Sequence, residues 1–133
     1  MVMWIYQNKE FTESDIGKYI GFVYIITNRT NNRRYIGKKL FWFSKTRTVK
    51  GKKKKEKALS DWQDYWSSSD ELKADVKKLG EENFTREILY LCANKGTMSY
   101  LELREQIDRR VLETNEYYNA FVGGKIHKTH VKL

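Results

Sequence analysis

Two tyrosines eleven residues apart and one carboxylate are the side chains of this sequence that could act together on a substrate. Tyr24 and Tyr35 occupy two apolar segments on either side of a polar, asparagine-rich turn. Glu105 lies with Leu101 and Leu112 on one stripe of an expected helix, where a carboxylate is costly to bury unless it is paired or binds a metal. Glu105 is therefore either a ligand for a divalent cation or the ion-pair partner of a nearby Lys or Arg.

The positive charge of the chain is concentrated in one stretch. The chain carries a net charge of +9, but residues 29–57 hold 13 of its 26 Lys and Arg residues and a single acid, Glu56. Such a patch is the electrostatic footprint of a polyanion partner. The aromatic run Phe41-Trp42-Phe43 inside it offers rings for base stacking and favours nucleic acid over a merely solvated basic face. The candidate contacts are Arg33, Arg34, Lys38, Lys45, Lys50, Lys52, Lys53, Lys54 and Lys55.

These residue types suit the hydrolysis of a phosphodiester bond. A tyrosine can orient the attacking water, or take its proton if cations lower the pKa of the phenol. An arginine can hold the non-bridging oxygens, and a divalent cation on a carboxylate can polarise the phosphate and the leaving oxygen. The sequence has no His or Cys cluster at metal-ligand spacing, no glycine-rich phosphate loop and no nucleophile elbow.

Composition indicates one folded domain over residues 1–133. Hydrophobic residues make up 40% of the chain and aromatic residues 14%, which is core material rather than the composition of a disordered chain. No apolar run approaches the roughly 18 residues that span a membrane, and the first ten residues do not resemble a signal peptide. A single cysteine, Cys92, fits a reducing compartment. We therefore expect an intracellular protein without a membrane partner.

Periodicity predicts the main elements. Segments 21–27 and 33–37 form an antiparallel hairpin, with Tyr24 and Tyr35 as neighbours, and segment 84–92 is another inner strand. The N-terminal alternation of Val2, Trp4 and Tyr6 permits a short strand. Residues 38–57 show no helical period and form a basic insertion over about 38–58, in which the run Lys52–Lys55 repels itself and is expected to be mobile when unbound.

Three capping boxes predict the helices. Ser60-x-x-Gln63 begins a short one, and Ser68-x-x-Glu71 begins a longer one that ends at Gly80. Ser99-x-x-Glu102 begins a third, which runs to about residue 113. On this last helix a wholly polar line is expected to face water, made of Glu102, Gln106, Arg109 and Glu113.

The hairpin resembles the signature of the GIY-YIG nucleases. Gly21-Phe22-Val23-Tyr24 is followed, eleven residues after its tyrosine, by Tyr35-Ile36-Gly37. Later segments are similar to those of the family in the same order, namely YWSSS at 65–69, GEENF at 80–84, REQ at 104–106 and YN at 118–119. The resemblance covers residues 21–119, and the small basic form resembles phage-encoded homing-type endonucleases.

The resemblance implies an α+β fold with a small central three-stranded antiparallel sheet flanked by helices. It also implies a DNA endonuclease with one divalent metal ion, Mg²⁺ or Mn²⁺, in each active site and no organic cofactor. Tyr24 then positions or deprotonates the attacking water, Tyr35 is the second signature tyrosine, Glu105 binds the metal and Asn119 supports the site. The protein would act as a monomer or homodimer on DNA, in the host cytoplasm if phage-encoded.

Two features depart from the family pattern. Gly21 stands one place before the first motif position, which holds Phe22. The family also places a catalytic arginine after the second motif, and Arg47 is the only arginine between residues 34 and 86. Lys39 or Lys45 could fill this role instead. Two other classes of function remain open: a DNA- or RNA-binding module that does not cut, and a structural protein whose tyrosines are only core.

Overall fold

The tyrosine-bearing hairpin forms the centre of a mixed sheet in the computed structural model, which describes residues 2–123 and 128–131. Strand β3 (Gly21–Asn28) pairs antiparallel with β4 (Arg34–Leu40) on one side and with β7 (Phe84–Cys92) on the other. These three strands are the predicted antiparallel core. The sheet is larger than predicted, because β1 (Trp4–Tyr6) pairs parallel with β7 and β2 (Lys9–Glu10) pairs with β1. The five strands follow the order β2-β1-β7-β3-β4, so β4 is an edge strand.

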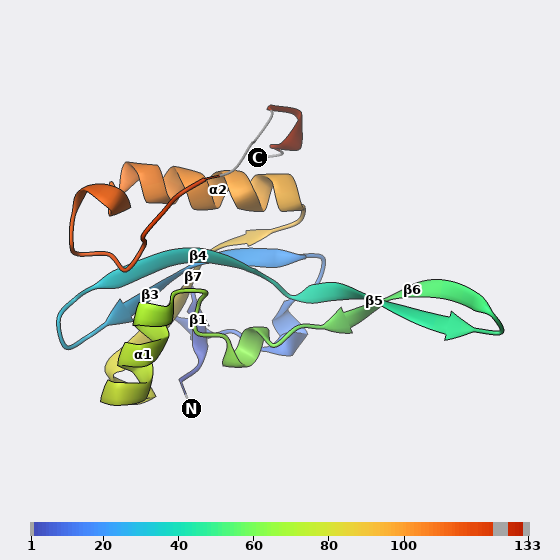
Figure 1. The fold of residues 1–133 in the computed structure, drawn as a ribbon, viewed down its shortest axis with the longest axis horizontal. Coiled ribbons are helices and arrows are strands. Elements are labelled where there is room, and N and C mark those ends of the chain that lie inside the picture. Colours follow the sequence, from blue (N-terminus) through green and yellow to red (C-terminus); the bar gives the residue numbers. More distant parts are fainter. Residues whose placement is uncertain (1, 124–127, 132–133) are drawn as a thin grey trace.

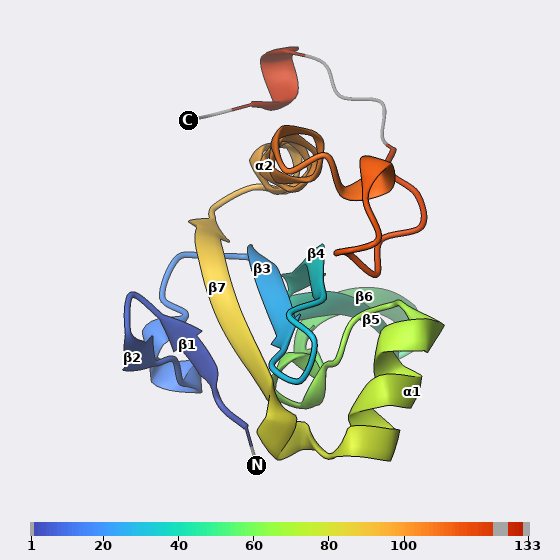
Figure 2. The same ribbon diagram turned by 90° about the vertical axis from the view of Figure 1, so that its left-hand side faces the viewer.

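Two helices cover opposite faces of this sheet (Figure 2). Helix α1 (Asp70–Leu79) packs Leu72 and Val76 into the cluster that contains Tyr24. Helix α2 (Lys95–Asp108) packs Met98 and Leu101 into a second cluster on the other face. The strict alternation along β3 explains this split, since successive side chains point to opposite faces of a sheet. Tyr24 therefore belongs to the α1 face of the sheet.

The helices begin at other residues than the capping boxes predicted. The N-cap of α1 is Ser69, one residue after Ser68, and its hydroxyl accepts a bond from the Leu72 amide at 3.2 Å. The N-cap of α2 is Asn94, five residues before Ser99, and it accepts from the Thr97 amide at 2.8 Å. Gly80 ends α1 as predicted, with φ at 93°. Short 3₁₀ turns complete the chain, at Glu13–Asp15, Trp62–Asp64, Glu81–Asn83, Val111–Glu113 and Lys128–His130.

The basic insertion is an ordered hairpin rather than a mobile segment. Strands β5 (Trp42–Val49) and β6 (Lys52–Leu59) pair antiparallel over their full length and extend away from the five-stranded sheet (Figure 1). The two-residue turn has φ values of 52° at Lys50 and 77° at Gly51, the left-handed geometry that fits the twist of paired strands. Backbone pairing thus holds the lysine run in an extended conformation. We call residues 42–59 the arm.

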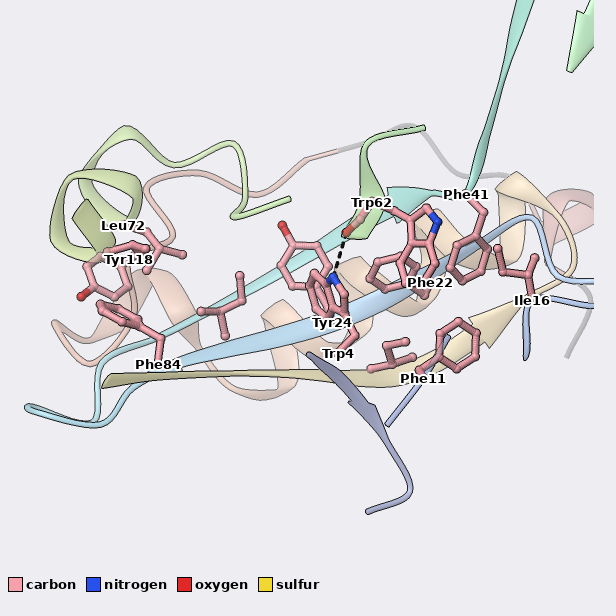
Figure 3. Packing of buried hydrophobic residues seen from close by; sticks show 13 residues of the cluster. Trp4, Phe11, Ile16, Phe22, Tyr24, Phe41, Trp62, Leu72, Phe84 and Tyr118 are labelled. Atoms are coloured by element: carbon pink, nitrogen blue, oxygen red, sulfur yellow. Dashed lines mark hydrogen bonds between the residues drawn. The ribbon is translucent and has the colours of Figure 1, made fainter. Parts of the chain in front are cut away.

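An aromatic cluster joins the root of the arm to the tyrosine face (Figure 3). Phe41, fully buried, packs against Phe22 and Trp62 with ring centroids 4.9 and 5.2 Å apart. Trp4 contacts Tyr24 edge to face and donates its indole N–H to the Trp62 carbonyl at 2.8 Å. The root of the arm is thereby packed into the same core as Tyr24. No helix of the described residues is long and apolar enough to cross a membrane.

Candidate active site

The glycine of the second motif makes room for the first tyrosine. Gly37 lies directly opposite Tyr24 across β3 and β4. A Cβ at position 37 would collide with the Tyr24 hydroxyl oxygen and come within 2.8 Å of the Tyr35 ring. The two tyrosine rings lie 6.1 Å apart between centroids. Any side chain at Gly37 would displace one of them, so Tyr-Ile-Gly is a packing unit as well as a motif.

Tyr24 is buried and stays protonated near neutral pH. Only 1% of the residue is exposed. Burial raises its pKa well above 10, and the neighbouring Tyr65 and Tyr35 raise it further. Of the two roles considered for a tyrosine, orienting the water or taking its proton, the raised pKa favours the first for Tyr24. Tyr24 also forms a side-chain hydrogen bond with Tyr65, which makes it suited to orienting a polar group rather than accepting a proton.

Tyr65 and Lys39 complete the tyrosine cluster. The Tyr65 ring lies 6.1 Å from that of Tyr24 and nearly perpendicular to it. The Lys39 ammonium lies 4.1 Å from the centre of the Tyr65 ring and 2.6 Å from Asp61 Oδ1. Of the three residues considered for the catalytic cation, Arg47, Lys39 and Lys45, Lys39 is therefore the one that the fold places next to a tyrosine of this cluster. Sequence reasoning noted the YWSSS segment but gave Tyr65 no role.

A buried arginine fixes the backbone of Tyr65. Arg86 on β7 is only 1% exposed and lies between the rings of Trp4 and Trp66, 4.7 and 4.4 Å from their centroids. Its Nη1 donates to the Tyr65 carbonyl at 2.9 Å, and Nη2 donates to the Val2 carbonyl. Burial lowers its pKa to about 10. A cation in this position ties the Tyr65 segment to the sheet.

Glu102 lies at the open edge of β4, beside the signature tyrosines. It lines a cavity of about 390 Å³ together with Tyr35, Ser68, Gln106 and Asn119. Its side chain is 16% exposed, and its ion-pair partner among the described residues is Lys38, with Nζ 3.9 Å from Oε1. Burial raises the pKa of Glu102, and Lys38 offsets this only in part. The prediction that Glu102 and Gln106 face water is wrong.

Glu105, the predicted metal ligand, is bonded to Tyr90 and Arg109. It accepts a hydrogen bond from the Tyr90 hydroxyl at 2.7 Å and from Arg109 Nε at 2.9 Å. Burial alone would raise its pKa, but these bonds outweigh burial and hold the pKa below its usual value. The structure therefore shows the ion pair, the other interpretation of Glu105, and the glutamate that lines the cavity beside Tyr35 is Glu102. Glu105 lies on the face of α2 that carries Met98 and Leu101, where Tyr90 of β7 and Arg109 satisfy its carboxylate.

Two amides fix the edge strand at the second motif. Asn119 pairs with both backbone groups of Ile36, accepting from its N–H at 3.1 Å and donating to its carbonyl at 2.9 Å. Gln106 donates to the same carbonyl at 3.2 Å. Ile36 lies between Tyr35 and Gly37, so these bonds hold the motif in place. The Tyr35 hydroxyl is in turn 3.0 Å from Ser68 Oγ.

Several predicted cations lie elsewhere. Arg47 and Lys45 belong to the arm, and Arg47 is paired with Glu56 at 3.1 Å. Neither residue is brought to the tyrosines. The Arg33 guanidinium is bonded to Glu71 at 3.1 Å and stacks over the Tyr118 ring at 4.2 Å, so its geometry does not support a DNA contact. Arg34 lies over the Tyr117 ring at 5.6 Å.

The fold and this site define an α+β protein whose tyrosines, lysine and half-buried carboxylate suit phosphodiester chemistry. Residues 4–122 match the family model described as "Putative endonuclease segE, GIY-YIG domain". The chain therefore belongs to this GIY-YIG endonuclease family, and nuclease is its class of function. No curated protein and no solved structure matches the chain.

Proposed function

We propose that the protein is a metal-dependent DNA endonuclease that hydrolyses phosphodiester bonds. The observation that carries this proposal is the Glu102 carboxylate, which is largely buried beside Tyr35 and whose ion-pair partner within residues 2–123 and 128–131 is a distant lysine. An ionised carboxylate kept in such a place is unfavourable unless a cation joins it. A divalent cation at this point would also stand next to the cluster of tyrosines.

The residues present fit Mg²⁺ or Mn²⁺. Mg²⁺ keeps several of its waters and binds through one or two carboxylates plus substrate phosphates. Within the described part of the chain no three His, Cys, Asp or Glu residues group as a cage, which suits a single-carboxylate site completed by substrate. When bound, the ion would polarise the phosphate and stabilise the leaving oxygen. The metal ligand in this proposal is Glu102 in place of Glu105.

The chain's own residues would orient the reactants. Tyr35, held by Ser68, presents its hydroxyl to the cavity, and the protonated Tyr24 lies behind it. Together with Tyr65 they would orient the attacking water. Lys39 is the cation placed to neutralise the phosphate, because Arg47 and Lys45 lie out on the arm. Asn119 would act as a positioning residue through the backbone of β4.

Cleavage of supercoiled plasmid tests this proposal. Purified protein is incubated with plasmid and either Mg²⁺ or EDTA, beside Glu102→Gln and the matched control Glu105→Gln. We expect metal-dependent nicking or linearisation by the wild type and by Glu105→Gln, and none by Glu102→Gln. Loss of cutting in Glu105→Gln alone would return the metal role to Glu105. A salt-sensitive mobility shift without cutting would instead favour a DNA- or RNA-binding module, which the basic arm also supports.

The partner in this proposal is DNA, contacted by the cations of the arm. A DNA substrate would place the protein inside a cell, in the host cytoplasm if it is phage-encoded. A monomer with one site would nick, whereas a two-fold dimer on DNA could cut both strands.

A further inference from the structure

The arm is a charged ribbon that the rest of the described chain leaves uncovered. It carries eight Lys and Arg residues and one acid, a net charge of +7. Side chains 43–48 and 52–57 are exposed on both faces of the ribbon. Eight-residue strands at about 3.3 Å per residue give it a reach of roughly 25 Å. A ribbon of this charge and length is suited to a partner of opposite charge outside the chain.

The root of the arm is fixed to the body. Phe41 is fully buried, and its amide donates to the Ile20 carbonyl at 2.9 Å. The Ser60 amide donates to the Phe41 carbonyl at 2.8 Å, while the Ser60 hydroxyl donates to the Leu40 carbonyl at 2.6 Å. The arm therefore leaves the sheet in a defined direction, close to Lys39. A partner held by the arm is also held relative to the tyrosine cluster.

The two faces of the arm carry equal charge but different chemistry. On one face each of three hydroxyl residues lies directly opposite a lysine; we call it the hydroxyl face, made of Ser44, Thr46, Thr48, Lys53, Lys55 and Lys57. The other face, the ion-pair face, holds the arm's one carboxylate and consists of Phe43, Lys45, Arg47, Val49, Lys52, Lys54, Glu56 and Ala58. Each face has a net charge of +3. Simple charge attraction would not choose between them.

The dimensions of the DNA major groove and the side chains of the arm together favour the hydroxyl face as the DNA-binding face. The major groove of B-DNA is about 12 Å wide and admits a two-stranded β-ribbon. Lysines at every second position stand about 7 Å apart, or roughly two base-pair steps of 3.4 Å. Ser and Thr hydroxyls can donate to or accept from base edges, and a Thr methyl can contact thymine. Glu56 on the opposite face would meet phosphates of its own sign.

We propose that the arm enters the major groove of duplex DNA with its hydroxyl face toward the base edges. The lysines of that face then contact guanine or the flanking phosphates, and Thr46 and Thr48 read bases. The ion-pair face turns to solvent. This inference rests on the proposed function in taking DNA as the partner. It adds the mode of binding and the residues that determine sequence preference.

Two charge-matched triple variants test the choice of face. Lys53→Ala/Lys55→Ala/Lys57→Ala empties the hydroxyl face, and Lys45→Ala/Lys52→Ala/Lys54→Ala removes the same charge from the other face. Affinity of the full chain for duplex DNA is measured in EDTA across a salt series. We expect the first variant to lose about tenfold more affinity than the second, with a salt slope lower by about 0.9 for each phosphate contact removed. Equal losses, or a larger loss in the second variant, would overturn the proposal.

Methylation interference tests the groove itself. Methylation at guanine N7, which lies in the major groove, should weaken binding by the wild type at a few clustered positions, whereas methylation at adenine N3 in the minor groove should not. The variant Thr46→Val/Thr48→Val keeps the charge and removes only the hydroxyls, so it should bind with similar affinity but a weaker sequence preference than the wild type. Insensitivity to N7 methylation would overturn the inference. Failure of the wild type to bind or cut any DNA would instead refute the proposed function.

Discussion

Two glutamates on one helix, three residues apart, have opposite electrostatic situations. The side chains of Glu102 and Glu105 are 16% and 17% exposed, so surface exposure does not distinguish them. Burial raises the pKa of Glu102, whereas Tyr90 and Arg109 overcome burial and lower that of Glu105. Glu102 lies deeper in the protein and has the more distant partner, so burial and partners together make the difference. Glu105 stabilises the fold in its ionised state, and Glu102 does not.

This difference indicates which glutamate has a functional role. A buried charge with poor partners lowers stability, and such groups cluster where chemistry requires them. Glu102 lies beside Tyr35 in a cavity. Burial is the main cause of the raised pKa of both signature tyrosines, and the charge of Glu102 raises it further. Glu105 has its hydrogen bonds satisfied and lies on the Tyr90 side of the helix. The comparison therefore separates a carboxylate kept for a ligand from one kept for the fold.

The largest expected effect is on cleavage. Glu102→Gln should lower the rate of plasmid cleavage at saturating Mg²⁺ by about a thousandfold or more, because a metal ion contributes several kcal/mol to transition-state stabilisation. Single-turnover rates measure this. Glu105→Gln should stay within a few-fold of the wild type once its stability is allowed for. Similar losses of activity in both variants would contradict the assignment of the metal to Glu102 alone.

The sequence predicted a solvent-exposed Glu102 and a metal-binding Glu105, whereas the structure places Glu102 in the cavity and Glu105 in an ion pair. Local sequence does not determine such tertiary contacts. The hairpin, β7 and α1 were predicted because alternation, turn residues and a C-terminal glycine are local signals. The start of α2 was placed at Ser99, yet Ser99 lies within the helix and accepts from Lys38 Nζ at 2.8 Å. Which helix face meets a sheet depends on tertiary packing. The buried amide of Gln106 is satisfied by a carbonyl 70 residues away in the chain.

The arm was mispredicted for a related reason. Charge repulsion along Lys52–Lys55 suggested mobility, whereas the register pairs these residues in turn with Val49, Thr48, Arg47 and Thr46 across the ribbon. The usable signals were the Lys50-Gly51 turn and the alternation of threonines before it. Local composition identified the positive charge of the arm but did not predict the pairing of its two strands. The parallel pairing of β1 with β7 spans about 80 residues and leaves no local trace.

The second effect is on stability, and it falls on the other glutamate. Glu105→Gln should lower the free energy of unfolding at pH 7 by about 1–3 kcal/mol, since it weakens charge-assisted bonds from Tyr90 and Arg109. The folded-state pKa of Glu105 lies below its unfolded value. Its contribution is therefore complete above the unfolded pKa and is lost as pH falls through the folded one. Urea unfolding at pH 7 and at pH 3 should show the wild-type advantage shrinking with acid.

The third effect has the opposite sign. Glu102→Gln should be as stable as the wild type at pH 7 or more so, because the folded-state pKa of Glu102 lies above its unfolded value and ionisation is unfavourable in the fold. This penalty is complete above the folded pKa and disappears as pH falls below the ordinary value of 4.5. Thermal unfolding without metal, compared between pH 7 and pH 4, measures the difference. A clear loss of stability at pH 7 would mean that Glu102 holds the fold together, as Glu105 does.

The smallest effect concerns Lys38, the cation that partly offsets the burial of Glu102. Lys38→Met removes the charge 3.9 Å from Glu102 and should raise the pKa of that carboxyl further. Since the ionised carboxylate is the form that binds a cation, the acidic limb of the pH profile of kcat/KM should move to higher pH. Lys77→Met on α1 removes the same charge from a helix that packs on the other face, and should leave that limb in place. If both variants shift the profile alike, the acidic limb reports overall charge and not the titration of Glu102.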